Sequence, residues 1–137
     1  MRDILGLLFI IWFYCSSCTE YVPDSYLIGK WENIENDGVV ELIFSVENKF
    51  EMKIKPVSND NIFSYKGDYI IDKNKIPNTI DLKNISNYSG PLYGILEIVD
   101  STTIKISQFS DKWRLRPILF NKNNSLLFNR KTIQGNS

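Results

Sequence analysis

The residue types that most often do chemistry in proteins are almost missing from this chain. Cys15 and Cys18 are the only thiols, and the 137 residues include no histidine. Histidine is the commonest general base in enzymes and the commonest ligand of transition metals. A Ser–His–Asp or Cys–His catalytic arrangement is therefore excluded, and a zinc site would need carboxylates alone. We expect no enzyme, no metal and no other cofactor.

Carboxylates are the acid–base groups that remain. The ones considered for a paired catalytic site are Asp68, Asp72, Asp81, Glu97 and Asp100. Asp72 and Asp100 lie at the ends of predicted strands, where acidic side chains commonly cap turns. Asp81 has apolar residues on both sides, so strand alternation points it to solvent. This pattern favours structural roles over catalysis.

Cys18 follows a short apolar segment near the start of the chain. Arg2 supplies a positive charge, residues 4–14 are apolar, and Ser16 and Ser17 lead into the cysteine. The apolar run is well short of the about 20 residues that a spanning helix needs. The pattern resembles a bacterial lipobox, at which a peptidase cuts ahead of a cysteine that carries lipid. Cys15 stands where the lipobox usually has leucine.

The lipobox resemblance implies a lipoprotein signal peptide over residues 1–17 and a lipidated tether over 18–25. It implies a place in the bacterial cell envelope, on the extracytoplasmic side of a membrane held through lipid on Cys18. Cleavage by the ordinary signal peptidase, or an uncleaved anchor, are the alternatives. The 16 basic and 16 acidic residues cancel, so nucleic acid is not an expected partner and charge alone does not bring the chain to a membrane.

Apolar and polar residues alternate through most of the chain after residue 26, as in half-buried strands. Phe50-Glu51-Met52-Lys53-Ile54-Lys55 alternates without error. The segment 85–91 is the longest break expected, and it is placed over one end of the fold. Turn residues separate the predicted strands, which are 29–34, 39–45, 50–55, 63–72, 79–83, 93–99, 103–107, 116–120 and 126–130.

About eight or nine short, closely connected strands predict an all-β domain over residues 26–133, with a tail at 134–137. An antiparallel up-and-down barrel is favoured over a sandwich, because closure removes the two sheet edges of a meander. In the last strand, Arg130 shares a face with Leu126 and Phe128 and points inward. A tryptophan ring is a suitable partner for an inward arginine.

A set of short motifs occurs along the chain in a particular order: Gly29-Lys30-Trp31, Tyr65-Lys66-Gly67-Asp68-Tyr69, Pro77-Asn78-Thr79-Ile80-Asp81-Leu82, Gly94-Ile95-Leu96-Glu97-Ile98, Ile104-Lys105-Ile106, Arg116-Pro117 and Leu127-Phe128-Asn129-Arg130. The set resembles a family of small lipocalin-like domains of unknown function in exported bacterial proteins. The resemblance implies a lipocalin-like barrel whose closed end is covered by Trp31, with Arg130 packed over the indole. It implies a fold and no particular activity.

Several large apolar side chains on the predicted strands are candidates for a ligand site inside the barrel. They are Phe50, Met52, Tyr65, Tyr69 and Leu96. One interpretation is a lipid-anchored protein that binds a small apolar or amphipathic ligand among them. The alternative is core packing in a solid barrel, which would serve as a non-enzymatic interaction module, protein-binding or inhibitor-like. A roomy lumen favours the first and a filled lumen the second.

A small basic and aromatic patch is predicted near the C-terminus. Arg114 and Arg116 flank Leu115 beside Trp113. A solvated loop and a contact with an anion or a partner are both compatible with this pattern.

The lipoprotein prediction is tested by removing the side-chain sulfur of Cys18. A Cys18→Ala variant lacks the sulfur that accepts the lipid, so we expect it to keep its signal peptide and to incorporate no radiolabelled palmitate. Both are read by gel mobility and autoradiography of expressing cells. A Cys18→Ala protein that is still processed and still labelled would show that the lipoprotein prediction is wrong.

Overall fold

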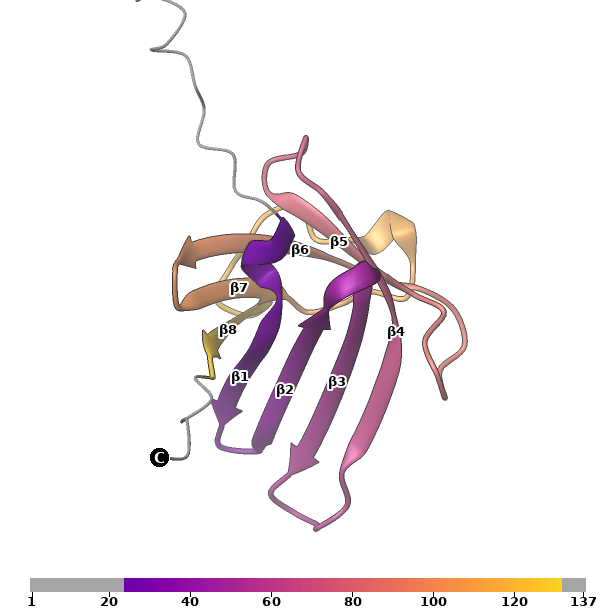
Figure 1. Ribbon diagram of the computed structural model, residues 1–137, viewed down its shortest axis with the longest axis vertical. Helices are drawn as coiled ribbons and strands as arrows, with labels where there is room; N and C mark the ends of the chain where they lie inside the picture. Colours follow the sequence, from indigo (N-terminus) through magenta and orange to yellow (C-terminus); the bar gives the residue numbers. More distant parts are fainter. Residues whose placement is uncertain (1–23, 132–137) are drawn as a thin grey trace, which may run out of the picture.

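The chain folds into a closed eight-stranded antiparallel barrel (Figure 1). A computed structural model describes residues 24–131, so the predicted signal peptide, Cys18, most of the tether and the tail lie outside the described residues. After a short 3₁₀ turn, η1 (Asp24–Leu27), the strands are β1 (Gly29–Glu35), β2 (Gly38–Ser45), β3 (Lys49–Pro56), β4 (Phe63–Asp72), β5 (Asn78–Lys83), β6 (Leu92–Asp100), β7 (Thr103–Ser107) and β8 (Ser125–Arg130). The predicted all-β up-and-down barrel is confirmed.

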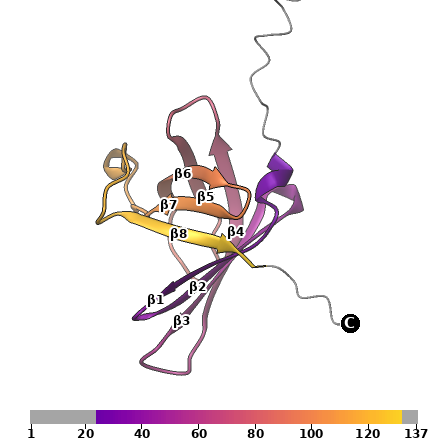
Figure 2. The same cartoon turned by 90° about the vertical axis from the view of Figure 1, so that its left-hand side faces the viewer.

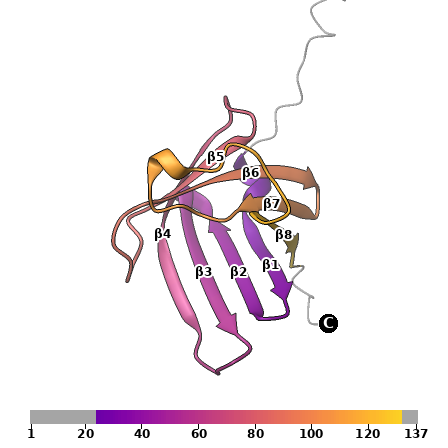
Figure 3. The ribbon, with the colours of Figure 1, turned by 180° about the vertical axis from the view of Figure 1, so that it is seen from behind.

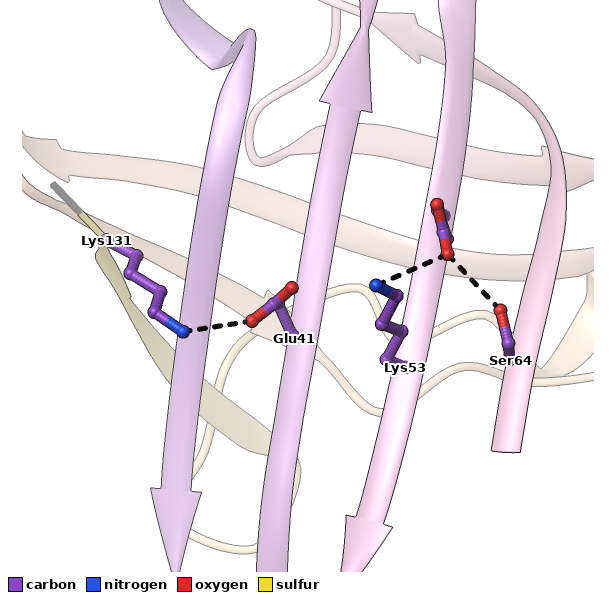
Figure 4. Close-up of polar contacts among 5 residues, drawn as sticks. Glu41, Lys53, Ser64 and Lys131 are labelled. Atoms are coloured by element: carbon purple, nitrogen blue, oxygen red, sulfur yellow. Dashed lines mark hydrogen bonds and ion pairs between the residues drawn. The ribbon is translucent and has the colours of Figure 1, made fainter. Parts of the chain in front are cut away.

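Consecutive strands pair as neighbours, and β8 returns to β1 to close the sheet. In Figure 1, β1 to β4 stand side by side and β5 to β8 cross behind them. Alternation along β1 to β4 sends polar side chains outward. There Lys131 lies 3.3 Å from Glu41, and Glu51 contacts both Lys53 (3.7 Å) and Ser64 (3.4 Å), as Figure 4 shows.

Side chains fill most of the barrel interior, as expected for a barrel of this strand number. The rings of Phe44 and Tyr69 meet edge to face at 4.9 Å between centroids. Around them lie other fully or nearly fully buried residues: Trp31, Leu42, Ile80, Leu82, Leu96, Ile104, Ile106 and Phe128.

The predicted strand at 116–120 is wrong, because this segment belongs to a long connection between β7 and β8. We call residues 108–124 the strap. It contains the 3₁₀ turn η3 (Trp113–Leu115) and crosses the outer face of β5 to β7, as Figure 3 shows. Both edges of β8 already face a strand in the closed sheet, and Pro117 has no backbone N–H to donate. A ninth strand therefore has no place in the ladder.

Two polar contacts hold the strap on the barrel. The Arg116 guanidinium lies 2.5 Å from the Asp81 carboxylate and 5.1 Å from the centre of the Tyr93 ring. Ser110 and Tyr93 exchange two backbone hydrogen bonds of 2.8 Å. Asp81 is thus paired and half-buried, whereas strand alternation placed it in solvent, because that pattern does not show which loop covers the outer face.

Closure between the first and last strands depends on few backbone pairs. β1 and β8 share only the pairs Trp31–Arg130 and Glu32–Asn129, and beyond them the two strands diverge, as Figure 2 shows. Inside the diverging region the Asn33 side-chain amide donates to the Leu127 carbonyl oxygen at 2.8 Å. The Asn33 side chain thus links β1 to β8 where the two strands form no backbone pairs.

Arg130 and Trp31 form the predicted contact at the η1 end of the barrel. The guanidinium lies 4.2 Å from the centre of the buried indole and donates to the carbonyl oxygens of Tyr26 (2.6 Å) and Ile28 (3.1 Å). The indole N–H donates to the Leu27 carbonyl at 2.9 Å. Gly29 has a φ of +137°, and a Cβ there would lie 2.9 Å from an Arg130 nitrogen. The arginine therefore joins η1, β1 and β8.

Removing this arginine should destabilise the whole barrel. Arg130→Met keeps an aliphatic stem but loses the cation–π contact and leaves two carbonyl groups without their charged donor. We expect the free energy of unfolding to fall by about 2–4 kcal/mol, measured by urea denaturation followed by circular dichroism.

The matched control is Arg114→Met, because Arg114 is an exposed arginine of the strap. That substitution should change the free energy of unfolding by no more than about 0.5 kcal/mol. Equal urea midpoints for Arg130→Met and the wild type would contradict the role given to Arg130.

Candidate functional site

One apolar cavity remains inside the barrel. Its volume is about 200 Å³. It lies among β3, β4, β5, the start of β6 and the connection at residues 84–91. The lining residues are Phe50, Met52, Ile54, Tyr65, Leu82, Ile85, Tyr88 and Leu92. Antiparallel order puts the 84–91 connection at the end of the barrel opposite η1.

Three of the five predicted ligand residues line this cavity, namely Phe50, Met52 and Tyr65. Tyr69 and Leu96 do not, since both are buried in the core. Tyr69 packs against Phe44, and Leu96 lies on β6 opposite Ile106 of β7. Alternation assigns both residues to the inner face, but it does not separate the filled part of the lumen from the open part.

The remaining lining residues were missed in the sequence, and some of them carried a usable signal. Ile54 follows Phe50 and Met52 at even spacing on β3, and Leu82 follows Ile80 on β5, so strand parity already placed them inside. Ile85 and Tyr88 belong to the connection that was predicted to cover one end of the barrel. No periodicity within that segment indicates which side chains turn inward.

The cavity suits an apolar group and no acid–base chemistry. Its lining holds aliphatic, thioether and aromatic side chains, and the phenol groups of Tyr65 and Tyr88 are its only side-chain hydrogen-bonding groups. A cavity of about 150 Å³ is enough for benzene. One ring or a short alkyl segment therefore fits, and the phenols offer hydroxyl groups to a polar end.

The carboxylates considered for catalysis are engaged in turns and ion pairs. The Asp72 and Asp100 side chains accept from the backbone N–H groups of Asn74 (2.9 Å) and Thr102 (2.8 Å), as turn caps do. Backbone and side-chain hydrogen bonds from Thr102 lower the pKa of Asp100 below its ordinary value. Glu97 lies 3.7 Å from Lys105 on the outer face.

Asp68 forms a polar cluster next to the cavity residue Phe50. It accepts hydrogen bonds from the Lys49 ammonium and, at 2.8 Å, from the Asn84 amide. These two donors lower the pKa of the Asp68 carboxyl, and the same carboxylate raises the pKa of Lys49. The cluster ties the starts of β3 and of the 84–91 connection to β4.

A larger groove of about 910 Å³ follows the seam where β1 and β8 diverge, but it is a different kind of site. Charged and polar side chains dominate its lining, among them Lys30, Glu32, Glu35 and Lys131. Because its lining is apolar, the cavity of the barrel is the better candidate for a small apolar ligand.

Within residues 24–131 no group of three or more acidic, cysteine or histidine side chains is arranged to hold a metal ion. No helix in that range is long and apolar enough to span a membrane. Comparisons with protein-family models, with curated proteins and with solved structures found no match for the chain.

The Asp68 cluster predicts a change in the acid stability of the barrel. Because the folded-state pKa is below the unfolded value, the ionised carboxylate stabilises the fold above the unfolded pKa of about 3.9. That contribution disappears as the pH falls through the folded-state pKa. Asp68→Asn should therefore be less stable than the wild type at neutral pH, and the difference should shrink below about pH 4. Urea titrations across pH measure it.

Asp60→Asn, in the exposed β3–β4 connection, is the matched control and should leave the pH dependence of the wild type unchanged. If the free energies of unfolding of Asp68→Asn and the wild type differed by the same amount at every pH, the role given to the Asp68 carboxylate would be contradicted.

Proposed function

We propose that this protein is a lipid-anchored, lipocalin-like binding protein of the bacterial envelope, and that it holds the apolar part of a small amphipathic ligand in the barrel cavity. The observation that carries this proposal is the cavity lined by eight apolar and aromatic side chains. Ligand pockets typically combine such a lining with a few polar groups that fix orientation. Tyr65 and Tyr88 are the groups available here.

The size of the cavity sets the size of the ligand. About 200 Å³ is below the roughly 300–1,000 Å³ of pockets that enclose a drug-sized molecule. Only a ring or short alkyl segment fits inside, so the rest of the ligand stays outside. This supports an amphipathic ligand whose polar part stays in water beside Tyr88, a cavity residue that is 40% exposed.

The proposed anchor agrees with this class of ligand. The described fold begins at Asp24, only a few residues after Cys18, so lipid on Cys18 would keep the barrel close to a bilayer. Amphipathic molecules partition into bilayer surfaces, where such a barrel would meet them. The chemistry assigned to the chain is binding without catalysis, since the cavity lining contains no nucleophile, carboxylate or imidazole.

The second candidate is the non-enzymatic interaction module. The buried core residues that fill part of the lumen, among them Trp31 and Phe128, support it, because a filled lumen leaves the outer surface and the loops to meet a partner. In that case the cavity would be a packing defect without a natural occupant.

Native mass spectrometry of the purified protein, offered an envelope lipid extract, separates the two candidates. We expect a saturable adduct on the wild type. Leu92→Trp places an indole in the cavity and should weaken the adduct by about tenfold, the fold-change for an overpacking cost of ~1.4 kcal/mol. Leu127→Trp, on the outer face of β8 where the side chain is half exposed, is the control and should bind as the wild type does.

Only the bare protein mass, with every extract offered, would overturn ligand binding and favour the interaction module. Equal adducts on the wild type and on Leu92→Trp would show that the ligand lies elsewhere.

A further inference from the structure

The strap is held firmly in place although it is a long connection. Besides the Asp81–Arg116 pair and the Tyr93–Ser110 bridge, the Gln108 N–H donates to the Asn124 carbonyl at 2.7 Å. Ile95 points to the outer face of β6 yet is only 2% exposed, because the strap lies over that face. The strap is therefore a structured part of the surface.

Despite this anchoring, the strap turns four large apolar side chains into solvent. Trp113 and Leu115 of η3 are 66% and 65% exposed, and Ile118 and Leu119, which follow Pro117, are 80% and 68% exposed. Ordinary soluble surfaces carry isolated apolar residues, whereas clustered ones mark a surface that meets a partner or a membrane.

Cationic residues lie among and beside these apolar residues in the sequence of the strap. Lys112, Arg114 and Lys122 belong to the strap and make no ion pair among the described residues, and Asp111 is its only acidic residue. The chain as a whole is neutral, so this excess of positive charge is local. An anionic surface is the complement of such a patch.

A fifth exposed apolar residue lies outside the strap. Ile76, in the connection between β4 and β5, is 99% exposed and follows Lys75. Figures 1, 2 and 3 all place this connection and the η3 turn at the upper end of the barrel. Both elements thus lie in the upper part of the molecule in these views, and each carries exposed apolar residues next to cationic ones in the sequence.

We propose that the strap docks on the surface of an anionic lipid bilayer. Trp113, Leu115, Ile118 and Leu119 enter the interfacial region, and Lys112, Arg114 and Lys122 face the lipid headgroups. Tryptophan and aliphatic side chains beside lysine and arginine are the composition of segments that lie in a membrane interface. Protein interfaces, in contrast, are depleted in lysine. The inference is independent of the cavity and adds a second contact that orients the barrel on the membrane.

Tryptophan fluorescence of the full chain tests this contact. The chain has three tryptophans, and the difference between the wild type and Trp113→Phe isolates the emission of Trp113. In vesicles of phosphatidylglycerol and phosphatidylcholine with brominated acyl chains, we expect that difference emission to shift to shorter wavelength and to be quenched. The emission that remains in Trp113→Phe comes from Trp12 and the buried Trp31, so only the difference emission is read as the response of the strap.

Two further variants separate the apolar from the charged contribution. Leu115→Ser/Ile118→Ser/Leu119→Ser keeps the reporter Trp113 and should lose the quenching. Lys112→Gln/Arg114→Gln/Lys122→Gln should lose the dependence on phosphatidylglycerol and on salt, since screening weakens surface attraction.

Trp113 that stays accessible to aqueous iodide in these vesicles, with no quenching by brominated lipid, would overturn the bilayer proposal and leave a protein partner as the occupant of the strap. Quenching that is equal with and without phosphatidylglycerol would overturn the role of the cationic residues.

Discussion

The structure depends on closing an eight-stranded sheet whose first and last strands share only two paired positions. Backbone hydrogen bonds alone are too few at this seam, so side chains complete it. Arg130 stacks on Trp31 and donates to carbonyl groups of the η1 region, and Asn33 bridges to β8 farther along. A partly buried arginine needs hydrogen-bond acceptors or a π face, and Arg130 has both. The closure of the sheet, η1 and the core around Trp31 therefore form one unit.

That closure divides the barrel interior into two regions with different properties. Near the η1 end, Trp31, Phe44 and Tyr69 fill the lumen and make it solid. At the other end, the 84–91 connection covers the sheet only partly, and the apolar cavity remains between it and β3. The strap buries Ile95 on the outside of the barrel, so the wall beside the cavity is two layers thick over β5 and β6.

Much of the fold was readable from the sequence, because alternation with a period of two directly reports which face of a strand is buried. Eight of the predicted strands, the inward face of Arg130 and three cavity residues follow from it, whereas the Trp31–Arg130 contact was implied by the resemblance to lipocalin-like domains. The strap was mistaken for a strand, since residues 116–120 look apolar whether they pair in a sheet or lie across one. The roles of Asp81, Ile85 and Tyr88 depend on contacts between segments far apart in the chain, and local patterns do not record such contacts.

The central claim is that side chains fill the lumen around Trp31 and that an apolar cavity lies opposite the Trp31–Arg130 end. Methyl NMR of the protein titrated with a medium-chain alkyl alcohol tests it most directly. The structure predicts saturable shifts at the cavity methyl groups, those of Met52, Ile54, Leu82, Ile85 and Leu92. It predicts none at the core methyl groups of Leu42, Ile80, Leu96, Ile104 and Ile106. Saturable shifts at the second set, or none at the first, would contradict the claim.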